Sequence, residues 1–413
     1  MKPGSGPDGA PYGDRGLLAR YRVGWPQGPL ESVAVSPKRI ALLCAAVAVI
    51  VSGGAALASI SIRDGRLSAL VRMSAQEPMA ALAREADPSF SLVDVQAHYD
   101  GVYFYTIARD PLARGRGHEL IDKAAYRYGH AGYGWLAWLA SAGRPRAVPA
   151  ALFGLSLAGL VVGAFALSLL ARDLGLSPWL GLVVALNPGM VFATTADTSE
   201  PVAMAALALA LLAWTRERYG WAAVALTAGC FIKEPLLLVP VGLGLWMIVE
   251  VLRGRAPLRW TRVAALAIGP LLYGGWFLYL RNVFGVWPSR QPSDEFLTAP
   301  FTGWIDSLRR AAGLATGPFE SMQIGNTSVA LLIVIGAVLL AGMILAIRVR
   351  NAIAPVFFLL ALLVFCLNWL GVLYPKDLIR EVALALALVP FLLGTANRRS
   401  LEEQVFQEPP QNP

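Results

Sequence analysis

Long apolar runs recur along this chain, and they constrain its fold more than any other feature of the sequence. Each run is near 20 residues long, enough for a helix to cross about 30 Å of hydrocarbon. The 413 residues are 56% hydrophobic and 15% charged, with a mean hydropathy of +0.56, whereas a soluble domain carries roughly 25% charged residues. We therefore predict an all-α polytopic membrane protein rather than one large soluble core.

The apolar runs predict about ten membrane-spanning helices, with boundaries good to a few residues. They cover residues 40–60, 147–171, 175–194, 201–215, 219–232, 235–252, 263–281, 327–347, 352–374 and 382–395. Residues 1–37 and 400–413 are predicted to be disordered cytoplasmic tails because of their composition. The transmembrane domain then occupies residues 38–399.

The charges between the runs predict which side each turn faces. Lys38 and Arg39 precede the first run, which favours an inside N-terminus. The short cationic turns then share the inner face; they contain Arg172, Arg216, Arg218, Arg253, Arg255, Arg259, Arg262, Arg348, Arg350, Arg398 and Arg399. The net charge of +8 therefore fits topology and contact with membrane lipids. No basic-aromatic motif indicates nucleic acid, and we predict a multi-pass protein of the plasma membrane.

A long polar stretch, residues 61–146, follows the first run and is predicted to face the extracytoplasmic side. It contains one apolar piece, residues 133–142, which is too short to span and suits a helix on the membrane surface. All three histidines, His98, His118 and His130, lie in this first outer loop. The loop is therefore the first place to look for a functional site.

Asp100 is the candidate catalytic residue of this loop. It lies beside Tyr99, Gly101 and Tyr103, and glycine lets the backbone approach a ligand closely. A carboxylate there could act as a general base toward a sugar hydroxyl, with His98, Tyr99 and Tyr103 as substrate contacts. A solvated loop acid and an interfacial belt of aromatic residues explain the same residues without any function.

A second acidic site follows the third run, in the segment from Ala196 to Pro201. Asp197 could help to bind a metal or orient a hydroxyl, and Glu200 is its neighbour. Helix capping is the alternative, because Asp, Thr and Ser favour the N-cap and Pro favours the first turn. The two roles are compatible.

Four cationic candidates are predicted on the outer face: Arg127, His130, Lys233 and Arg380. Cations at this level could hold the phosphate of a lipid carrier. The alternatives are side chains that snorkel to the interface, and local pairing of Arg380 with Asp377 or Glu381.

The sequence lacks the motifs of several common enzyme and metal sites. There is no phosphate-binding Walker loop, no nucleophile elbow and no His-Glu-x-x-His zinc motif. Cys44, Cys230 and Cys366 lack metal-ligand spacing, and disulfides among them are not expected. No cofactor is predicted with certainty; a divalent cation, Mg²⁺ or Mn²⁺, stays open, with its ligands unknown.

The order of these features resembles that of the GT-C glycosyltransferases: one span, a long outer loop with an early acid, a surface helix, then many spans. The segment His98-Tyr99-Asp100-Gly101-Val102-Tyr103 with Ile107-Ala108 resembles the Trp-Asp-Gly-x-x-Tyr-x-x-Ile-Ala pattern of PIG-V-type mannosyltransferases and their bacterial relatives. Residues 126–140 and 192–200 are similar to later segments of that family. His98-Tyr99 stand where the family has a tryptophan.

The resemblance implies a GT-C fold and the transfer of a sugar, mannose first, from a polyprenyl-phosphate donor to a glycan, lipid or protein acceptor. Asp100 matches the family's catalytic acid, and Glu200 matches the acid of the second outer loop. Two other classes remain: a polyprenyl-linked lipid transporter or flippase, and a non-catalytic scaffold for envelope assembly. A transporter needs ionisable groups at mid-membrane, and the predicted span centres carry almost none.

Overall fold

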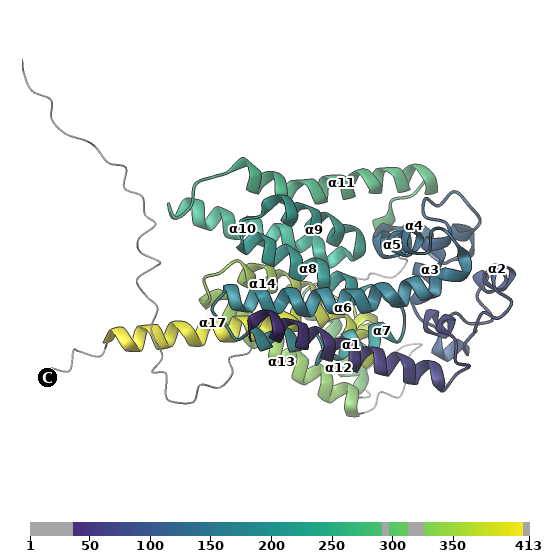
Figure 1. Cartoon of the computed structure of the whole chain (residues 1–413), viewed down its shortest axis with the longest axis horizontal. Helices are drawn as coiled ribbons and strands as arrows, with labels where there is room; N and C mark the ends of the chain where they lie inside the picture. Colours follow the sequence, from purple (N-terminus) through teal and green to yellow (C-terminus); the bar gives the residue numbers. More distant parts are fainter. Residues whose placement is uncertain (1–35, 291–296, 313–325, 408–413) are drawn as a thin grey trace, which may run out of the picture. The chain divides into compact units, whose positions relative to one another are not determined.

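The computed structural model describes residues 36–290, 297–312 and 326–407, which form helices joined by turns (Figure 1). Within these ranges the only β pairing is two isolated bridges, Ser74 with Val93 and Leu297 with Leu367. Five helices are long and apolar enough to cross a membrane. They are α1 (Pro37–Ser61), α6 (Val148–Asp173), α10 (Leu238–Leu252, with the turn before it), α11 (Trp260–Phe284) and α13 (Asn326–Arg348). The prediction of an all-α protein with membrane-spanning helices is confirmed.

A sixth span arises if α16 (Pro375–Glu381) and α17 (Ala383–Gln407), which meet at a bend of 53°, are taken as one. Three further apolar helices are shorter: α8 (Glu200–Thr215), α9 (Tyr219–Ile232) and α14 (Ile353–Phe365). The number of ten spans therefore stays a prediction. Helix α17 runs past residue 399, where the tail was expected to begin, because its continuation is rich in helix formers. Residues 1–35 and 408–413 of the predicted tails lie outside the described ranges.

Two of the predicted runs are not continuous helices. The run 175–194 divides into the 3₁₀ helix η6 (Pro178–Val183) and α7 (Pro188–Thr194). Proline lacks the N–H that would continue a helix, and the Asn187 side chain accepts the Gly189 N–H at 3.0 Å to start α7 afresh. The run 352–374 breaks likewise after α14, and Asn368 caps the short helix α15 (Trp369–Leu373).

The apolar helices pack side by side as a bundle. Helix α6 packs against α1 and α8, and α9 packs against α8 and α11. A Cβ atom on Gly159 of α6 would lie 2.6 Å from the Pro201 carbonyl oxygen of α8, so this close crossing requires glycine. Helix α14 packs against α10, α13 and α17. Buried Leu, Ala and Phe side chains of these helices form the main apolar core.

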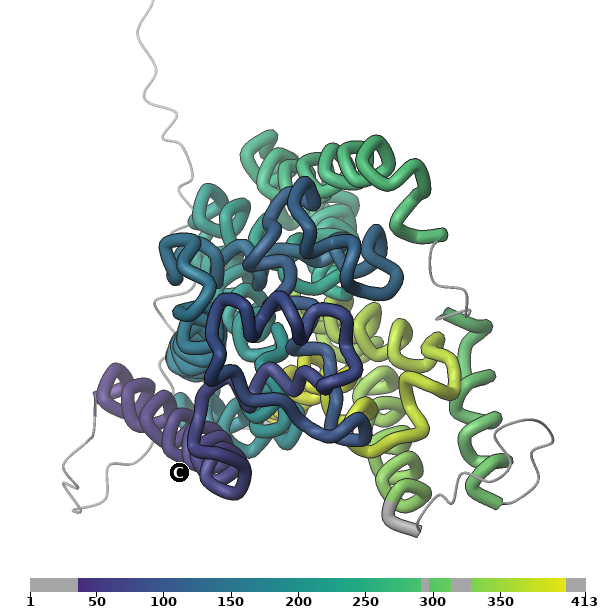
Figure 2. Tube along the Cα trace, turned by 90° about the vertical axis from the view of Figure 1, so that its right-hand side faces the viewer, coloured from purple at the N-terminus to yellow at the C-terminus, as the bar shows by residue number. Residues whose placement is uncertain are grey.

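The first loop folds into short helices that lie across one end of the long helices (Figure 2). Their bounds are η1 (Leu67–Val71), α2 (Met79–Ala86), η2 (Val95–Ala97), α3 (Gly101–Arg109), η3 (Gly117–Leu120), α4 (Ala124–Arg127), η4 (Tyr128–His130), α5 (Gly132–Ala140) and η5 (Pro145–Ala147). The predicted surface helix corresponds to α5, which packs against α3, α6 and α9. The loop has its own apolar core, with Met79, Phe90, Tyr105 and Tyr133 buried in it. It is a folded layer that can position side chains.

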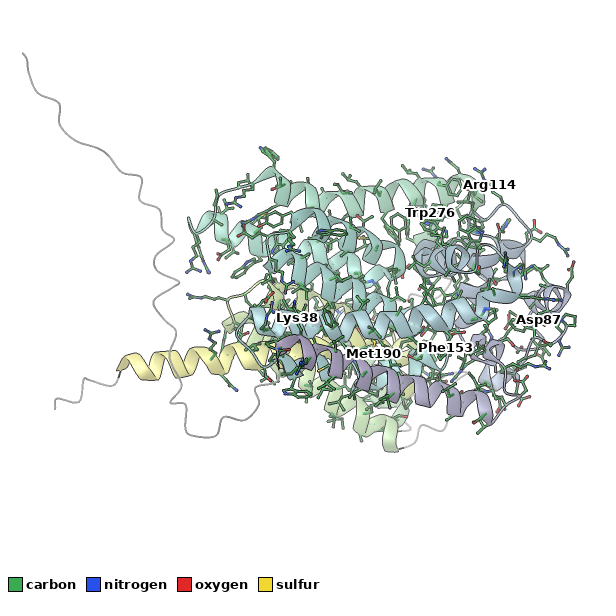
Figure 3. All side chains as sticks on the ribbon, in the orientation of Figure 1. Lys38, Asp87, Arg114, Phe153, Met190 and Trp276 are labelled. Atoms are coloured by element: carbon green, nitrogen blue, oxygen red, sulfur yellow. The ribbon has the colours of Figure 1, made fainter. Side chains whose placement is uncertain are left out.

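The arginines of the predicted inner turns gather at another end of the helices. Asp173, at the end of α6, lies 2.6 Å from both Arg172 and Arg216. Glu217, after α8, lies 3.1 Å from Arg259, just before α11. Figure 3 places Asp87 and Arg114 on the first-loop side and Lys38, at the start of α1, away from it. Helix ends that the charge pattern assigns to one side thus do lie together.

Candidate functional site

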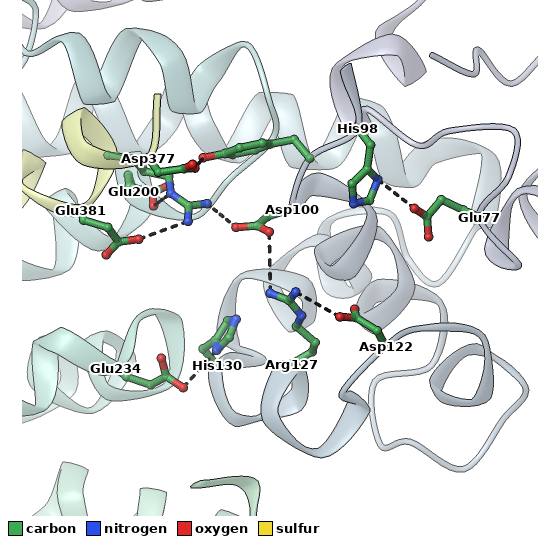
Figure 4. A network of polar contacts seen from close by, with 12 residues as sticks. Glu77, His98, Asp100, Asp122, Arg127, His130, Glu200, Glu234, Asp377 and Glu381 are labelled. Atoms are coloured by element: carbon green, nitrogen blue, oxygen red, sulfur yellow. Dashed lines mark hydrogen bonds and ion pairs between the residues drawn. The ribbon is translucent and has the colours of Figure 1, made fainter. Parts of the chain in front are cut away.

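Six charged side chains from five segments meet near the start of α3, and we call them the charge cluster; Figure 4 labels Asp100, Arg127, Glu200 and Glu381 of this cluster. They are Asp100, just before α3; Arg127, at the end of α4; Glu200, the first residue of α8; Lys233, just after α9; and Arg380 and Glu381, at the end of α16. The structure thus brings together five of the residues that the sequence predicts. The sixth, Glu381, was considered from the sequence only as a local partner of Arg380.

Arg380 is the centre of the charge cluster. Its Nη1 donates to Asp100 Oδ2, and its Nη2 donates to Glu381 Oε1 at 3.1 Å. Its Nε lies 3.4 Å from Glu200 Oε1. One guanidinium group therefore contacts three carboxylates, which its planar fork of donors allows. Local pairing with Glu381, the alternative raised for this arginine, exists together with the two distant pairs.

Lys233 and Glu200 form a buried ion pair beside Arg380. Lys233 Nζ donates to Glu200 Oε1 at 2.6 Å and lies 3.7 Å from Glu381 Oε2. The two side chains are only 10% and 2% exposed. Because removing either partner would leave an uncompensated buried charge, this pair must be retained or replaced as a unit.

Asp100 lies between two guanidinium groups. Arg380 binds one carboxylate oxygen, and Arg127 Nη1 lies 3.7 Å from the other. Partial burial alone would raise the pKa of Asp100, but Arg380 and then Arg127 hold this pKa well below its usual range. The side chain is 28% exposed, so Asp100 is a carboxylate at the rim of the cluster that its two arginines favour in the charged form.

Gly101 explains how the backbone holds Asp100 there. A Cβ atom at residue 101 would lie 2.6 Å from the Val71 carbonyl oxygen and 2.7 Å from the Ala196 carbonyl oxygen. A larger residue would force these two chain segments apart. Gly101 therefore lets the start of α3, with Asp100, pack between the end of η1 and the turn that precedes α8.

Arg127 and the two tyrosines line the same region. The Arg127 guanidinium lies 3.6 Å over the Tyr103 ring, and its Nη2 lies 3.6 Å from Asp122. The Tyr99 hydroxyl donates to Asp377, and Arg380 lies 5.0 Å over the Tyr99 ring. Both tyrosines predicted as substrate contacts thus contact the cations of the cluster.

Each histidine of the chain pairs with a carboxylate. His98 Nδ1 lies 3.0 Å from Glu77, and Figure 4 shows this pair on the far side of Asp100 from Glu234. His130 Nδ1 lies 3.2 Å from Glu234, beside the cluster. Glu234 was not predicted as a site residue, although its position next to Lys233 could have indicated it.

Asp197 differs from the other predicted acids. Its side chain is fully buried, and neither carboxylate oxygen has a hydrogen-bond partner in the described chain. Burial raises the pKa of Asp197 well above its usual range, and Arg72 opposes this only in part. Its backbone is left-handed, with φ of 46°, which is uncommon outside glycine. No ion pair joins Asp197 to the charge cluster among the described residues.

A metal ion has no obvious ligand set here. Among the described residues, no group of three or more His, Cys, Asp or Glu side chains is arranged to hold one. The acids of the charge cluster instead each face a lysine or arginine. The Mg²⁺ or Mn²⁺ left open by the sequence stays a prediction.

Comparisons with known proteins add no family to this geometry. The resemblance to the GT-C glycosyltransferases therefore remains a prediction. A scan against protein-family models found none that matches the sequence, and a search of curated proteins found no match either.

Proposed function

We propose that this chain is a plasma-membrane glycosyltransferase of the GT-C type. It transfers a sugar, mannose being the predicted one, from a polyprenyl-phosphate donor to a glycan, lipid or protein acceptor. The observation that carries the proposal is the position of Asp100 between Arg380 and Arg127, at the end of a set of apolar helices. An amphiphilic donor suits this arrangement, since its chain belongs in lipid and its phosphate belongs beside cations.

The reaction asks two things of the protein. The leaving polyprenyl phosphate gains negative charge as the bond from its oxygen to the anomeric carbon breaks, and fixed cations stabilise that charge. Arg380, Arg127 and Lys233 supply them. The acceptor hydroxyl must also lose a proton as its oxygen bonds to the anomeric carbon. Two groups could receive that proton, the Asp100 carboxylate and the His130 imidazole.

The placement of charge favours an enzyme over a transporter. A transporter needs ionisable groups near mid-membrane along a path. Here Glu200 begins its helix, Lys233 follows its helix and Arg380 lies in the short helix before the bend. Together with the cationic turns, this placement supports an extracytoplasmic site on the first-loop side.

The test is sugar transfer by purified protein in lipid nanodiscs. We expect transfer from radiolabelled polyprenyl-phosphate mannose to a membrane glycan fraction, and a loss of about 10²-fold or more in Asp100→Asn. Asp94→Asn is the matched control, because Asp94 is an exposed acid of the same loop. Near-normal transfer by Asp100→Asn would contradict the role of Asp100.

Two further outcomes separate the rival classes. Movement of the labelled lipid between leaflets without sugar transfer would identify a transporter. If the protein shows neither sugar transfer nor lipid movement, the non-catalytic scaffold remains as the third class. Full activity in a chelator would argue against the divalent cation.

A further inference from the structure

We propose that His130, oriented by Glu234, is the group that takes the proton from the acceptor hydroxyl, and that Asp100 positions Arg380 and Arg127. This inference rests on the proposed glycosyl transfer and reassigns roles within the same site. The sequence had assigned the proton to Asp100 and a phosphate contact to His130.

Asp100 is poorly placed to act as a base. Two guanidinium groups contact its carboxylate, and their charge lowers its pKa. A general base works best when its pKa lies near the working pH. A carboxylate held this way anchors the two arginines better than it accepts a proton.

The His130 ring is held in a defined orientation. Its Nδ1 pairs with Glu234 Oε1 at 3.2 Å. Phe104 and Tyr126 pack edge-on to the ring, with centroids 5.9 Å and 5.5 Å away. No described residue makes a hydrogen bond with Nε2, and the side chain is 14% exposed. Figure 4 shows His130 between Glu234 and Arg127, so the second ring nitrogen is left for a ligand at the cluster.

A carboxylate on one ring nitrogen is the arrangement that makes imidazole an effective base. It fixes the tautomer, with the proton on Nδ1, and stabilises the imidazolium that forms. In the proposed step, Nε2 accepts the hydroxyl proton while the oxygen bonds to the anomeric carbon. The bond from that carbon to the phosphate oxygen breaks, and its electron pair leaves with polyprenyl phosphate. The imidazolium later returns its proton to water.

The other two histidine pairs serve as internal comparisons. His118 Nδ1 lies 2.9 Å from Asp110, but that carboxylate also accepts the backbone N–H groups of Arg114, Gly115 and His118. That pair closes a loop. His98 pairs with Glu77 on the other side of Asp100. Only the His130 pair adjoins the charge cluster among the described residues.

Several other charged groups lie around His130. Glu234 pairs with its ring, and Asp100 is the other acid nearby. Arg127 and Lys233 are the cations that act on Glu234. The hydroxyls of Tyr126 and Tyr273 also lie near Glu234. The pH profile of transfer reports the balance of these groups.

The test begins with kcat/KM of the wild-type protein between pH 5 and 8. The donor is a phosphodiester and does not titrate in this range, and histidine is the side chain that ordinarily does. We expect the rate to rise with pH across this window and then level off. A flat profile would return the base role to Asp100, whose pKa is held below the window.

Variants then show which residue causes the increase of kcat/KM with pH. His130→Gln should lower kcat by about 10²-fold or more and abolish the rise. Glu234→Gln keeps the imidazole but removes its carboxylate, so it should move the rise to lower pH. Asp100→Asn should lower the rate of transfer but keep its increase with pH. His118→Gln should change neither the rate nor its pH dependence. A rise that survives in folded His130→Gln, or does not move in Glu234→Gln, overturns the inference.

Donor binding separates this role from phosphate binding. Binding of polyprenyl phosphate itself should be unchanged in His130→Gln and weakened in Arg380→Gln. Weakened binding in His130→Gln would show that His130 contacts the phosphate, and it would contradict the role of His130 as the general base. If the wild-type protein transfers no sugar at all, the proposed function fails first, and the two failures cannot be confused.

Discussion

Asp100 and Asp197 are neighbours in the fold and yet lie in opposite environments. The backbones beside them touch, since Gly101 packs against the Ala196 carbonyl. Asp100 has two arginine partners and keeps its charge. Asp197 is buried without a hydrogen bond in the described chain, and we expect it to keep its proton at neutral pH. Partners, rather than residue type or position along the chain, decide which acid is charged.

The largest contrast should come from removing the nearest cation of each acid. Arg380→Gln leaves Asp100, Glu200 and Glu381 without their shared guanidinium, which should lower the free energy of unfolding by about 3–5 kcal/mol and abolish transfer. Arg72→Gln loses hydrogen bonds to Thr195 but strands no charged acid. Its expected cost is about 1–2 kcal/mol.

Thermal unfolding in detergent, followed by tryptophan fluorescence, measures both variants. Equal losses would mean that Asp197 is charged and depends on Arg72 as Asp100 depends on Arg380. That result would remove the difference between the two sites.

A smaller effect should follow from disturbing the backbone contact between the two acids. Gly101→Ala places a methyl group against two carbonyl oxygens, which we expect to cost about 1–3 kcal/mol and to displace Asp100. The rate of sugar transfer should fall even where the variant stays folded, because the Asp100 carboxylate moves away from Arg380. Gly274→Ala, in α11, is the control, since its Cβ would meet nothing within 4 Å. A normal rate in Gly101→Ala would show that the position of Asp100 is not critical.

The smallest and most diagnostic effect is on the pH dependence of stability. The pKa of Asp100 is lower in the folded state than its ordinary 3.8, so its contribution is present above pH 3.8 and is lost as pH falls through the folded pKa. The pKa of Asp197 is raised, so its contribution is present below pH 3.8 and is lost as pH rises through the folded pKa.

Asparagine variants should therefore diverge from the wild type in opposite directions. Asp197→Asn should become more stable than the wild type as pH rises from 4 to 7, because the unfolded wild-type chain gains an ionised carboxylate. Asp100→Asn should be less stable than the wild type at pH 7, and the gap should close in acid. Melting temperatures of Asp197→Asn and the wild type between pH 4 and 7 check the first sign, and those of Asp100→Asn and the wild type below pH 3.8 check the second. Curves that stay parallel in the matching range would contradict the assigned protonation state.

The sequence predicted the helices better than it predicted their breaks. Continuous apolar runs located α6 and α11 to within a few residues, since a membrane span needs little beyond length and hydropathy. The divided run at η6 and α7 depends on Pro188 and the Asn187 cap, which an apolar run conceals. Charge asymmetry placed Arg127, Lys233 and Arg380 at one level, and the structure brings them together.

The distant partners of the cations could not be predicted: pairing of Arg380 with Glu381 was an alternative from the sequence, but its contacts with Asp100 and Glu200 were not. Asp197 and Glu200 are three residues apart, but the left-handed backbone at Asp197 turns the two side chains into different surroundings. Glu234 follows the predicted cation Lys233 directly, so considering the acids next to each cation would have found it. Distances between segments far apart in sequence decide the pairs, and those depend on how the helices pack.

The Asp100–Arg380 pair also bears on how the protein is made. The two residues are 280 positions apart in the chain. A nascent chain that has reached only residue 370 has already produced Asp100 and Glu200 but not the guanidinium that contacts both. Until the last helices are inserted, these acids have only Arg127 and Lys233 as partners. The site is therefore complete only once α16 has been made, and a chain that stops before Arg380 leaves Asp100 and Glu200 without the guanidinium that joins them.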